Sequence, residues 1–159
     1  MLLTDVNVLV YAYSEGAEDH ARYREWLHEV LGSDQAYGYS ELVLSGFVRV
    51  VTNPRVLTPP SPVELALEFA DGLRHRPNAV AIGPGPRHWG IFTRLCRECG
   101  ARGNLVADAY HAALAIESGS EWITTDRDYA RFAGLPLASS LQGRRLTGSP
   151  MRSPRLPRP

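Results

Sequence analysis

The chain has 159 residues, of which 44% are hydrophobic and 21% are charged, as in one ordinary globular domain rather than a disordered or fibrous protein. No apolar stretch approaches the roughly 18 residues of a membrane helix, and Asp5 interrupts the apolar start that a signal peptide would need, so we expect a cytoplasmic protein. Five of the 17 basic residues, all arginine, lie in residues 143–159, which leaves 12 against all 17 acids in residues 1–142. The formal net charge is zero.

The first half of the chain predicts one strand followed by helices. Residues 2–11 are apolar and β-branched, which indicates a short buried strand that ends near Asp5 and leads into a turn or helix. Apolar residues at helical spacing then predict three helices, at 19–31, 41–51 and 61–74. Ser40 and Ser61 stand at the N-cap positions of the second and third, and Pro62 follows Ser61 as a favourable first residue.

The second half alternates strands and helices. Strands are predicted at 79–82 and 122–124, helices at 87–99, 105–118 and 128–133, and a candidate last strand at 135–137. Asn104 is the predicted N-cap of the helix at 105–118. This alternation predicts an α/β fold with a short parallel sheet and helices on both faces. Residues 143–159 consist mainly of Arg, Pro, Ser and Gly, so we expect a domain at 1–142 followed by a flexible tail.

The two cysteines, Cys96 and Cys99, form a single C-x-x-C. Zinc requires four ligands, and no second pair or nearby histidine completes such a site. The pair also falls late in a predicted helix, whereas a thioredoxin-like redox motif opens one. Reduced thiols without a metal or redox role are therefore the favoured interpretation.

Two acids stand where strands of the predicted sheet end. Asp5 lies near the end of the first strand, and Asp126 comes just after the strand at 122–124. Ligands of open parallel sheets gather at the carboxyl ends of the strands, so both positions suit a functional site. Taken alone, each acid also has a simpler explanation as a turn or surface residue.

Two more acids lie near the starts of helices. Asp108 is in the first turns of an alanine-rich helix, and Glu41 begins the helix that follows Ser40. Compensation of the helix dipole would explain either one. Four carboxylates in one pocket, however, repel one another unless cations lie between them. Oxygen ligands favour Mg²⁺ or Mn²⁺, which can activate water for attack on a phosphodiester.

With these four acids in this order, the chain resembles the PIN-domain ribonucleases, specifically toxins of the VapC type. Each matching segment is short, but together they extend over almost the whole of residues 1–140. The segments are residues 3–11 (LTDVNVLVY), 40–42 (SEL), 47–54 (FVRVVTNP), 104–109 (NLVADA) and 124–132 (TTDRDYARF).

The resemblance implies a three-layer α/β sandwich with an acidic catalytic pocket that binds Mg²⁺ or Mn²⁺. The catalytic acids would be Asp5, Glu41, Asp108 and Asp126. Asp5 and Asp108 would be the firmest metal ligands and Asp126 a further one, while Glu41 would act directly or through water.

Four other residues are implied to support the metal or face the substrate. Thr124 occupies the place of a hydroxyl that holds a metal-bound water, and Asn7 would donate to Asp5. His111 and Asp128 complete this set. A buried or solvated helix histidine is an open alternative for His111, and an ion pair with Arg131 is one for Asp128.

The resemblance further implies an endoribonuclease toxin that cleaves tRNA, rRNA or mRNA and stops translation until a VapB-type antitoxin covers the site. Homodimers are expected, with heterotetramers or larger assemblies in the presence of antitoxin, and no membrane association. Two alternatives stay open: a non-toxic PIN-type nuclease acting in RNA processing or on DNA flaps, and a non-catalytic protein that binds a basic peptide. The tail is either a phosphate-binding arm or an inert extension, and we favour the inert extension.

Overall fold

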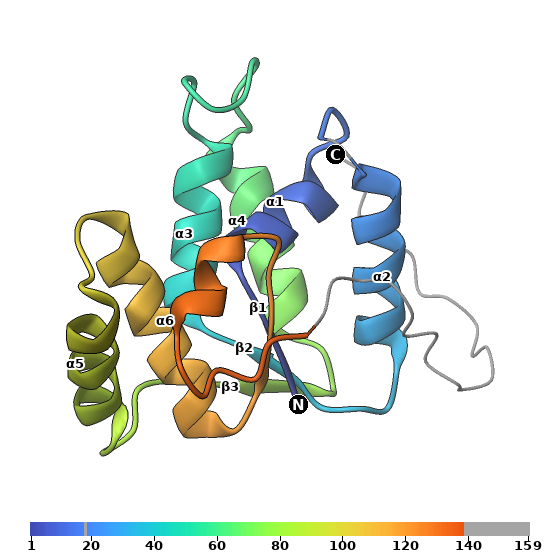
Figure 1. Cartoon of the computed structure of the whole chain (residues 1–159). Helices are drawn as coiled ribbons and strands as arrows, with labels where there is room; N and C mark the ends of the chain where they lie inside the picture. The colour runs from blue at the N-terminus through green and yellow to red at the C-terminus, as the bar shows by residue number, and fades with distance from the viewer. Residues whose placement is uncertain (18, 139–159) are drawn as a thin grey trace.

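The computed structural model describes residues 1–17 and 19–138. These residues form a four-stranded sheet in the order β3-β2-β1-β4, and every neighbouring pair is parallel. The strands are β1 (Leu2–Thr4), β2 (Tyr37–Tyr39), β3 (Ala79–Ala81) and β4 (Glu121–Ile123). Because all of them run in one direction, their carboxyl ends meet at one edge of the sheet (Figure 1). The predicted α/β fold is confirmed.

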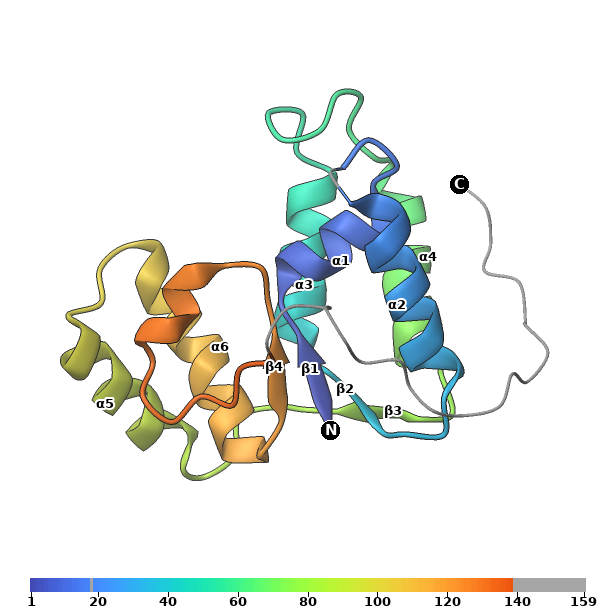
Figure 2. The same cartoon turned by 45° about the vertical axis from the view of Figure 1, so that its right-hand side comes forward.

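In the part of the chain that the structure describes, six α-helices connect the strands, followed by one 3₁₀-helix. They are α1 (Val6–Tyr13), α2 (His20–Gly32), α3 (Glu41–Val51), α4 (Val63–Arg74), α5 (His88–Cys99), α6 (Asn104–Ser118) and the 3₁₀-helix η1 (Arg127–Arg131). Helices α1 to α4 form one layer, in which α1 packs on both α2 and α3 and α3 packs on α4, whereas α5 packs on α6 and α6 contacts β4. The two helical layers lie on opposite sides of the sheet (Figure 2).

The core fills the space between the sheet and both layers. Leu3 of β1 and Trp122 of β4 are fully buried, as is Phe47 of α3. On the other side, α6 buries the small side chains of Ala109 and Ala112 completely. Small residues allow a helix to approach its neighbours closely, which brings the start of α6 near the carboxyl ends of β1 and β4.

Strand β2 is missing from the sequence prediction. It is only three residues long, Tyr37-Gly38-Tyr39, and lies between β1 and β3. A glycine in its centre weakens the strand pattern. In the fold that glycine allows close packing, because a Cβ at Gly38 would lie 3.1 Å from the Leu2 carbonyl oxygen.

The predicted helix caps at Ser61 and Asn104 are wrong. Pro62 holds the N-cap position of α4, and the Ser61 hydroxyl hydrogen-bonds to the Tyr13 hydroxyl instead. Gly103, with a φ of 55°, precedes α6, so Asn104 is the first helical residue. Ser40 does precede α3, although its side chain makes no capping hydrogen bond. At Ser61 a tertiary contact, and at Gly103 the backbone geometry, replaces the predicted local cap.

The end of the domain also differs in detail. The candidate strand at 135–137 is reduced to a single parallel bridge between Leu137 and Trp122. The tail predicted at 143–159 lies outside the described residues. No helix in the described part of the chain has the length and apolar character that a membrane span requires.

Candidate active site

Asp5 joins β1 to α1 and is held by both backbone and side-chain contacts. Its Oδ1 accepts a hydrogen bond from the Val6 backbone N–H at 2.7 Å, which caps α1. Its Oδ2 accepts from the Thr124 hydroxyl at 2.6 Å, and its own N–H donates to the Ile123 carbonyl at 2.9 Å. With only 4% of its surface exposed, Asp5 is a buried carboxylate at the carboxyl edge of the sheet.

Thr124 connects Asp5 to Asp126. Besides donating to Asp5, the Thr124 hydroxyl oxygen accepts from the Asp126 backbone N–H at 3.0 Å. The Asp126 Oδ1 in turn accepts from the Asp128 backbone N–H at 2.8 Å and thereby caps η1. The acid that follows β1 and the acid that follows β4 are therefore linked through one hydroxyl.

Asp108 reaches the same region from the first turns of α6. Its Oδ1 lies 3.5 Å from the hydroxyl of Tyr129, a buried residue of η1. Tyr129 is not among the site residues predicted from the sequence, because an aromatic residue in a short helix is typical of the core. The only sequence feature that points to Tyr129 as a site residue is its position three residues after Asp126.

The pKa values show that three acids share one local field. The pKa of Asp5 is raised to about 6, mainly by burial and also by the charges of Asp108 and Asp126, while the hydrogen bonds from Thr124 and Val6 lower it. Burial followed by the charge of Asp126 also raises the pKa of Asp108. The pKa of Tyr129 is raised by burial and then by the charges of all three acids.

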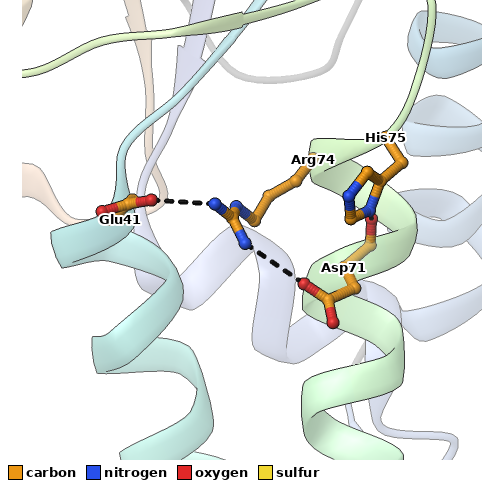
Figure 3. A network of polar contacts seen from close by, with 4 residues as sticks. All are labelled: Glu41, Asp71, Arg74 and His75. Atoms are coloured by element: carbon orange, nitrogen blue, oxygen red, sulfur yellow. Dashed lines mark hydrogen bonds and ion pairs between the residues drawn. The ribbon is translucent and has the colours of Figure 1, made fainter.

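Glu41, the fourth predicted acid, is engaged elsewhere. It begins α3, its side chain is 76% exposed, and its Oε1 lies 2.9 Å from Nη2 of Arg74 at the end of α4 (Figure 3). Among the described residues, the charges that raise the pKa values of Asp5 and Asp108 come from Asp108, Asp126 and Asp128, and not from Glu41. The structure thus brings three of the four predicted acids together.

Among the described residues, the side chains of the remaining candidates make no hydrogen bond to the three acids, although the charge of Asp128 raises the pKa of Asp108. Asn7 is exposed on α1, and its side chain makes no hydrogen bond to any described residue. His111 is buried, with its ring stacked on Trp122 at a centroid distance of 5.8 Å, and its pKa is lowered to about 4 by burial and by His88. Asp128 is exposed and lies 3.9 Å from Arg131, which is the ion pair considered as its alternative role.

The acid cluster fits a hydrated divalent cation. Among the described residues, no group of three or more His, Cys, Asp or Glu side chains is arranged to hold an ion directly. Mg²⁺ does not need such a cage, since one or two carboxylates and several waters commonly hold it. The Asp5 carboxylate is buried, and its hydrogen bonds from described residues come only from the neutral groups of Val6 and Thr124, so a cation would relieve its unfavourable charge.

Two other features lie outside this site. A groove of about 420 Å³, lined mainly by α1, α2, α4 and residues 57–62, contains none of the predicted site residues. Cys96 and Cys99 are free and half-buried on α5.

Comparisons with known proteins agree with the fold. The family model described as PIN domain matches residues 2–135. A VapC ribonuclease of Mycobacterium bovis is 43% identical over 143 residues, which are 90% of this chain and 97% of that protein. Ribonuclease VapC25 of Mycobacterium tuberculosis is 36% identical over 135 residues, which are 85% of this chain and 95% of that protein.

Two solved structures share the fold at lower sequence identity. One is VapBC2 from Rickettsia felis bound to a DNA fragment from the promoter, with a TM-score of 0.61, 18% identity and coverage of 86% of this chain and 96% of that chain. The other is VapBC-1 from nontypeable Haemophilus influenzae, with a TM-score of 0.60, 14% identity and coverage of 89% and 98%.

Proposed function

Because this chain belongs to the PIN-domain family and is of the VapC type, we propose that it is an endoribonuclease toxin that requires Mg²⁺ or Mn²⁺ and is neutralised by a VapB-type antitoxin. The ribonuclease names of its relatives support the activity, and the VapBC structures support the partner. One observation carries the metal requirement: Asp5, Asp108 and Asp126 share one field at the carboxyl edge of β1 and β4.

The chain's own residues prepare this site for a phosphodiester. The Val6 N–H and the Thr124 hydroxyl orient the Asp5 carboxylate, and Tyr129 supports Asp108 as a neutral donor. Asp5 and Asp108 would hold the cation with Asp126, partly through water. A bound divalent cation supplies positive charge to the scissile phosphate and makes water more acidic.

RNA would reach this site through local positive patches, because residues 1–142 carry 12 arginines against 17 acids. Exposed arginines suited to this contact are Arg49, Arg55, Arg127 and Arg131. Transfer, ribosomal or messenger RNA is the proposed substrate class. The proposed assembly is a homodimer that forms a heterotetramer or larger complex with antitoxin.

The decisive experiment is RNA cleavage by the purified full chain, freed of antitoxin, with Mg²⁺, Mn²⁺ or a chelator. We expect cleavage only with the divalent ions and a loss of at least about a hundredfold in Asp108→Ala, since that substitution removes a proposed metal ligand. Glu98→Gln is the matched control, because it alters an exposed ion pair with Arg94 on α5. Wild-type rates in Asp108→Ala, or cleavage in the chelator, would exclude the mechanism.

A second measurement separates a toxin from a non-toxic nuclease. Expression of the chain alone should arrest growth, and co-expression of the adjacent small reading frame should relieve the arrest. Normal growth with an active nuclease would favour a role in RNA processing. Tight binding of a basic peptide without any nuclease activity would favour a binding protein.

A further inference from the structure

The backbone places Glu41 at the same edge of the sheet as the acid cluster. Strand β2 pairs in parallel with β1, and Glu41 follows β2 by two residues as Asp5 follows β1 by one. A carboxylate at this place could turn toward Asp5. Its side chain instead faces α4 (Figure 3).

Arg74 is the residue that holds Glu41 there. Its Nη2 lies 2.9 Å from Glu41 Oε1, and its Nη1 lies 3.3 Å from Asp71 Oδ1 one turn earlier on α4. Its guanidinium carbon is 5.9 Å from the centre of the Tyr39 ring. The guanidinium therefore has three partners, and two of them, Asp71 and Tyr39, would stay if Glu41 moved away.

We propose that Arg74 is a positioning residue that keeps the Glu41 carboxylate outside the acid cluster until a divalent cation competes for it. The proposal rests on the proposed function, because the competing cation is the one bound by Asp5 and Asp108. Glu41 is 76% exposed and has a flexible side chain, so the carboxylate can reorient without repacking the core. An exposed ion pair is weak, and a cation among several acids attracts a further carboxylate strongly.

The ion pair is not needed to dock α3 on α4. The two helices are in contact along apolar faces, and the Phe47 and Phe69 rings lie 5.0 Å apart. Replacement of Arg74 should therefore leave the fold intact and change mainly the freedom of Glu41.

The experiment is a double-mutant cycle on Mn²⁺ affinity, measured by calorimetry on the full chain without RNA. We expect Arg74→Gln to bind Mn²⁺ about three- to fivefold more tightly than wild type, which is the strength of one exposed ion pair. In a Glu41→Gln background the same substitution should have no effect, because the competing carboxylate is absent. Arg74→Lys should return the affinity toward wild type.

Arg94→Gln is the charge-matched control, since it removes one arginine from an exposed pair on α5. It should leave Mn²⁺ affinity unchanged, and circular dichroism should show that all variants are folded. Unchanged or weaker binding in Arg74→Gln overturns the inference, as does tighter binding that persists in Glu41→Gln. If the cycle behaves as expected but wild type cuts no RNA, the proposed function fails and the role of Arg74 stands.

Discussion

Asp5 caps α1 and is also a proposed metal ligand. The substitution Asp5→Asn separates these two roles. Asn at this position keeps an oxygen for the Val6 N–H but loses the charge. We expect Asp5→Asn to be at least as stable as wild type at neutral pH, because burial no longer acts on a charge, and to lose at least about a hundredfold in RNA cleavage. Thermal unfolding and cleavage assays would measure both.

Asp5→Ala is the companion variant, because it removes cap and charge together. Its loss of the cap should cost about 1 kcal/mol relative to Asp5→Asn. If Asp5→Asn cuts RNA at the wild-type rate, Asp5 does not hold the metal.

Asp5 and His111 have pKa values displaced in opposite directions in the fold. The pKa of Asp5 is raised from 3.8 to about 6, so its contribution to stability is full below 3.8 and is lost as pH rises through 6. The pKa of His111 is lowered from 6.5 to about 4, so its contribution is full above 6.5 and is lost as pH falls through 4. Each contribution to the free energy of unfolding is on the order of 3 kcal/mol. Between pH 4 and 6 the two contributions change with pH in opposite directions.

Single variants at Asp5 and His111 should separate the two pH-dependent contributions to stability. His111→Phe keeps a ring against Trp122 but no longer titrates, so its unfolding free energy relative to wild type should rise as pH falls from 6.5 to 4. For Asp5→Asn the same difference should fall as pH falls from 6 to 3.8. Denaturant unfolding in a chelator provides the measurement. Differences that do not vary with pH would contradict the prediction.

The part of the site that follows strands was predictable from the sequence, and the part set by tertiary contacts was not. Asp5 and Asp126 come directly after strand patterns, and parallel strands place both at one edge. The pairing of Glu41 with Arg74 joins residues 33 positions apart on two helices, and no local pattern reports it. Tyr129 was missed because it resembles an ordinary core residue and its contact with Asp108 joins residues 21 positions apart.

Among the elements, the crossing of α1 and α3 next to Asp5 depends on Gly46. A Cβ at this position would lie 2.9 Å from Cγ2 of Val6, which is closer than carbon atoms pack. Ala is better than Gly in a helix by about 1 kcal/mol, but overpacking against a stiff β-branched side chain costs about 1–3 kcal/mol. We expect Gly46→Ala to destabilise the chain by about 1 kcal/mol in equilibrium unfolding.

Gly46→Ala in a Val6→Ala background tests whether the contact with Val6 causes the destabilisation. With the Val6 methyl groups removed, Gly46→Ala should become stabilising by up to about 1 kcal/mol. Destabilisation of equal size in both backgrounds would show that the contact with Val6 is not responsible.

Helices were predicted more reliably than strands, and the reason is length. Helix α3 has the bounds that its apolar spacing predicted, Glu41–Val51, because eleven residues show several repeats of the helical period. Strand β2 has three residues, too few to show alternation. The helix caps were the least accurate part of the prediction, because the Ser61 hydroxyl hydrogen-bonds to the Tyr13 hydroxyl instead of capping α4.

At the scale of the whole molecule, positive charge is concentrated beyond the domain. The family model matches residues 2–135, and the last backbone hydrogen bond to the sheet among the described residues is from Ala138 N–H to the Trp122 carbonyl. We therefore propose that residues 1–142 form the nuclease and that residues 143–159 are not required for it.

Truncation after residue 142 tests this division. The shortened chain should unfold at the same temperature as the full chain and cut RNA with the same kcat, because it keeps the acid cluster and every described contact. Because residues 143–159 are proposed to be an inert extension, the KM of the shortened chain at about 0.15 M salt should also be unchanged. The truncation removes five arginines. If these arginines contact RNA phosphates, their loss would raise KM and weaken the dependence of KM on salt. A rise of more than about threefold, with that weaker salt dependence, would instead assign the arginines to an RNA-binding arm.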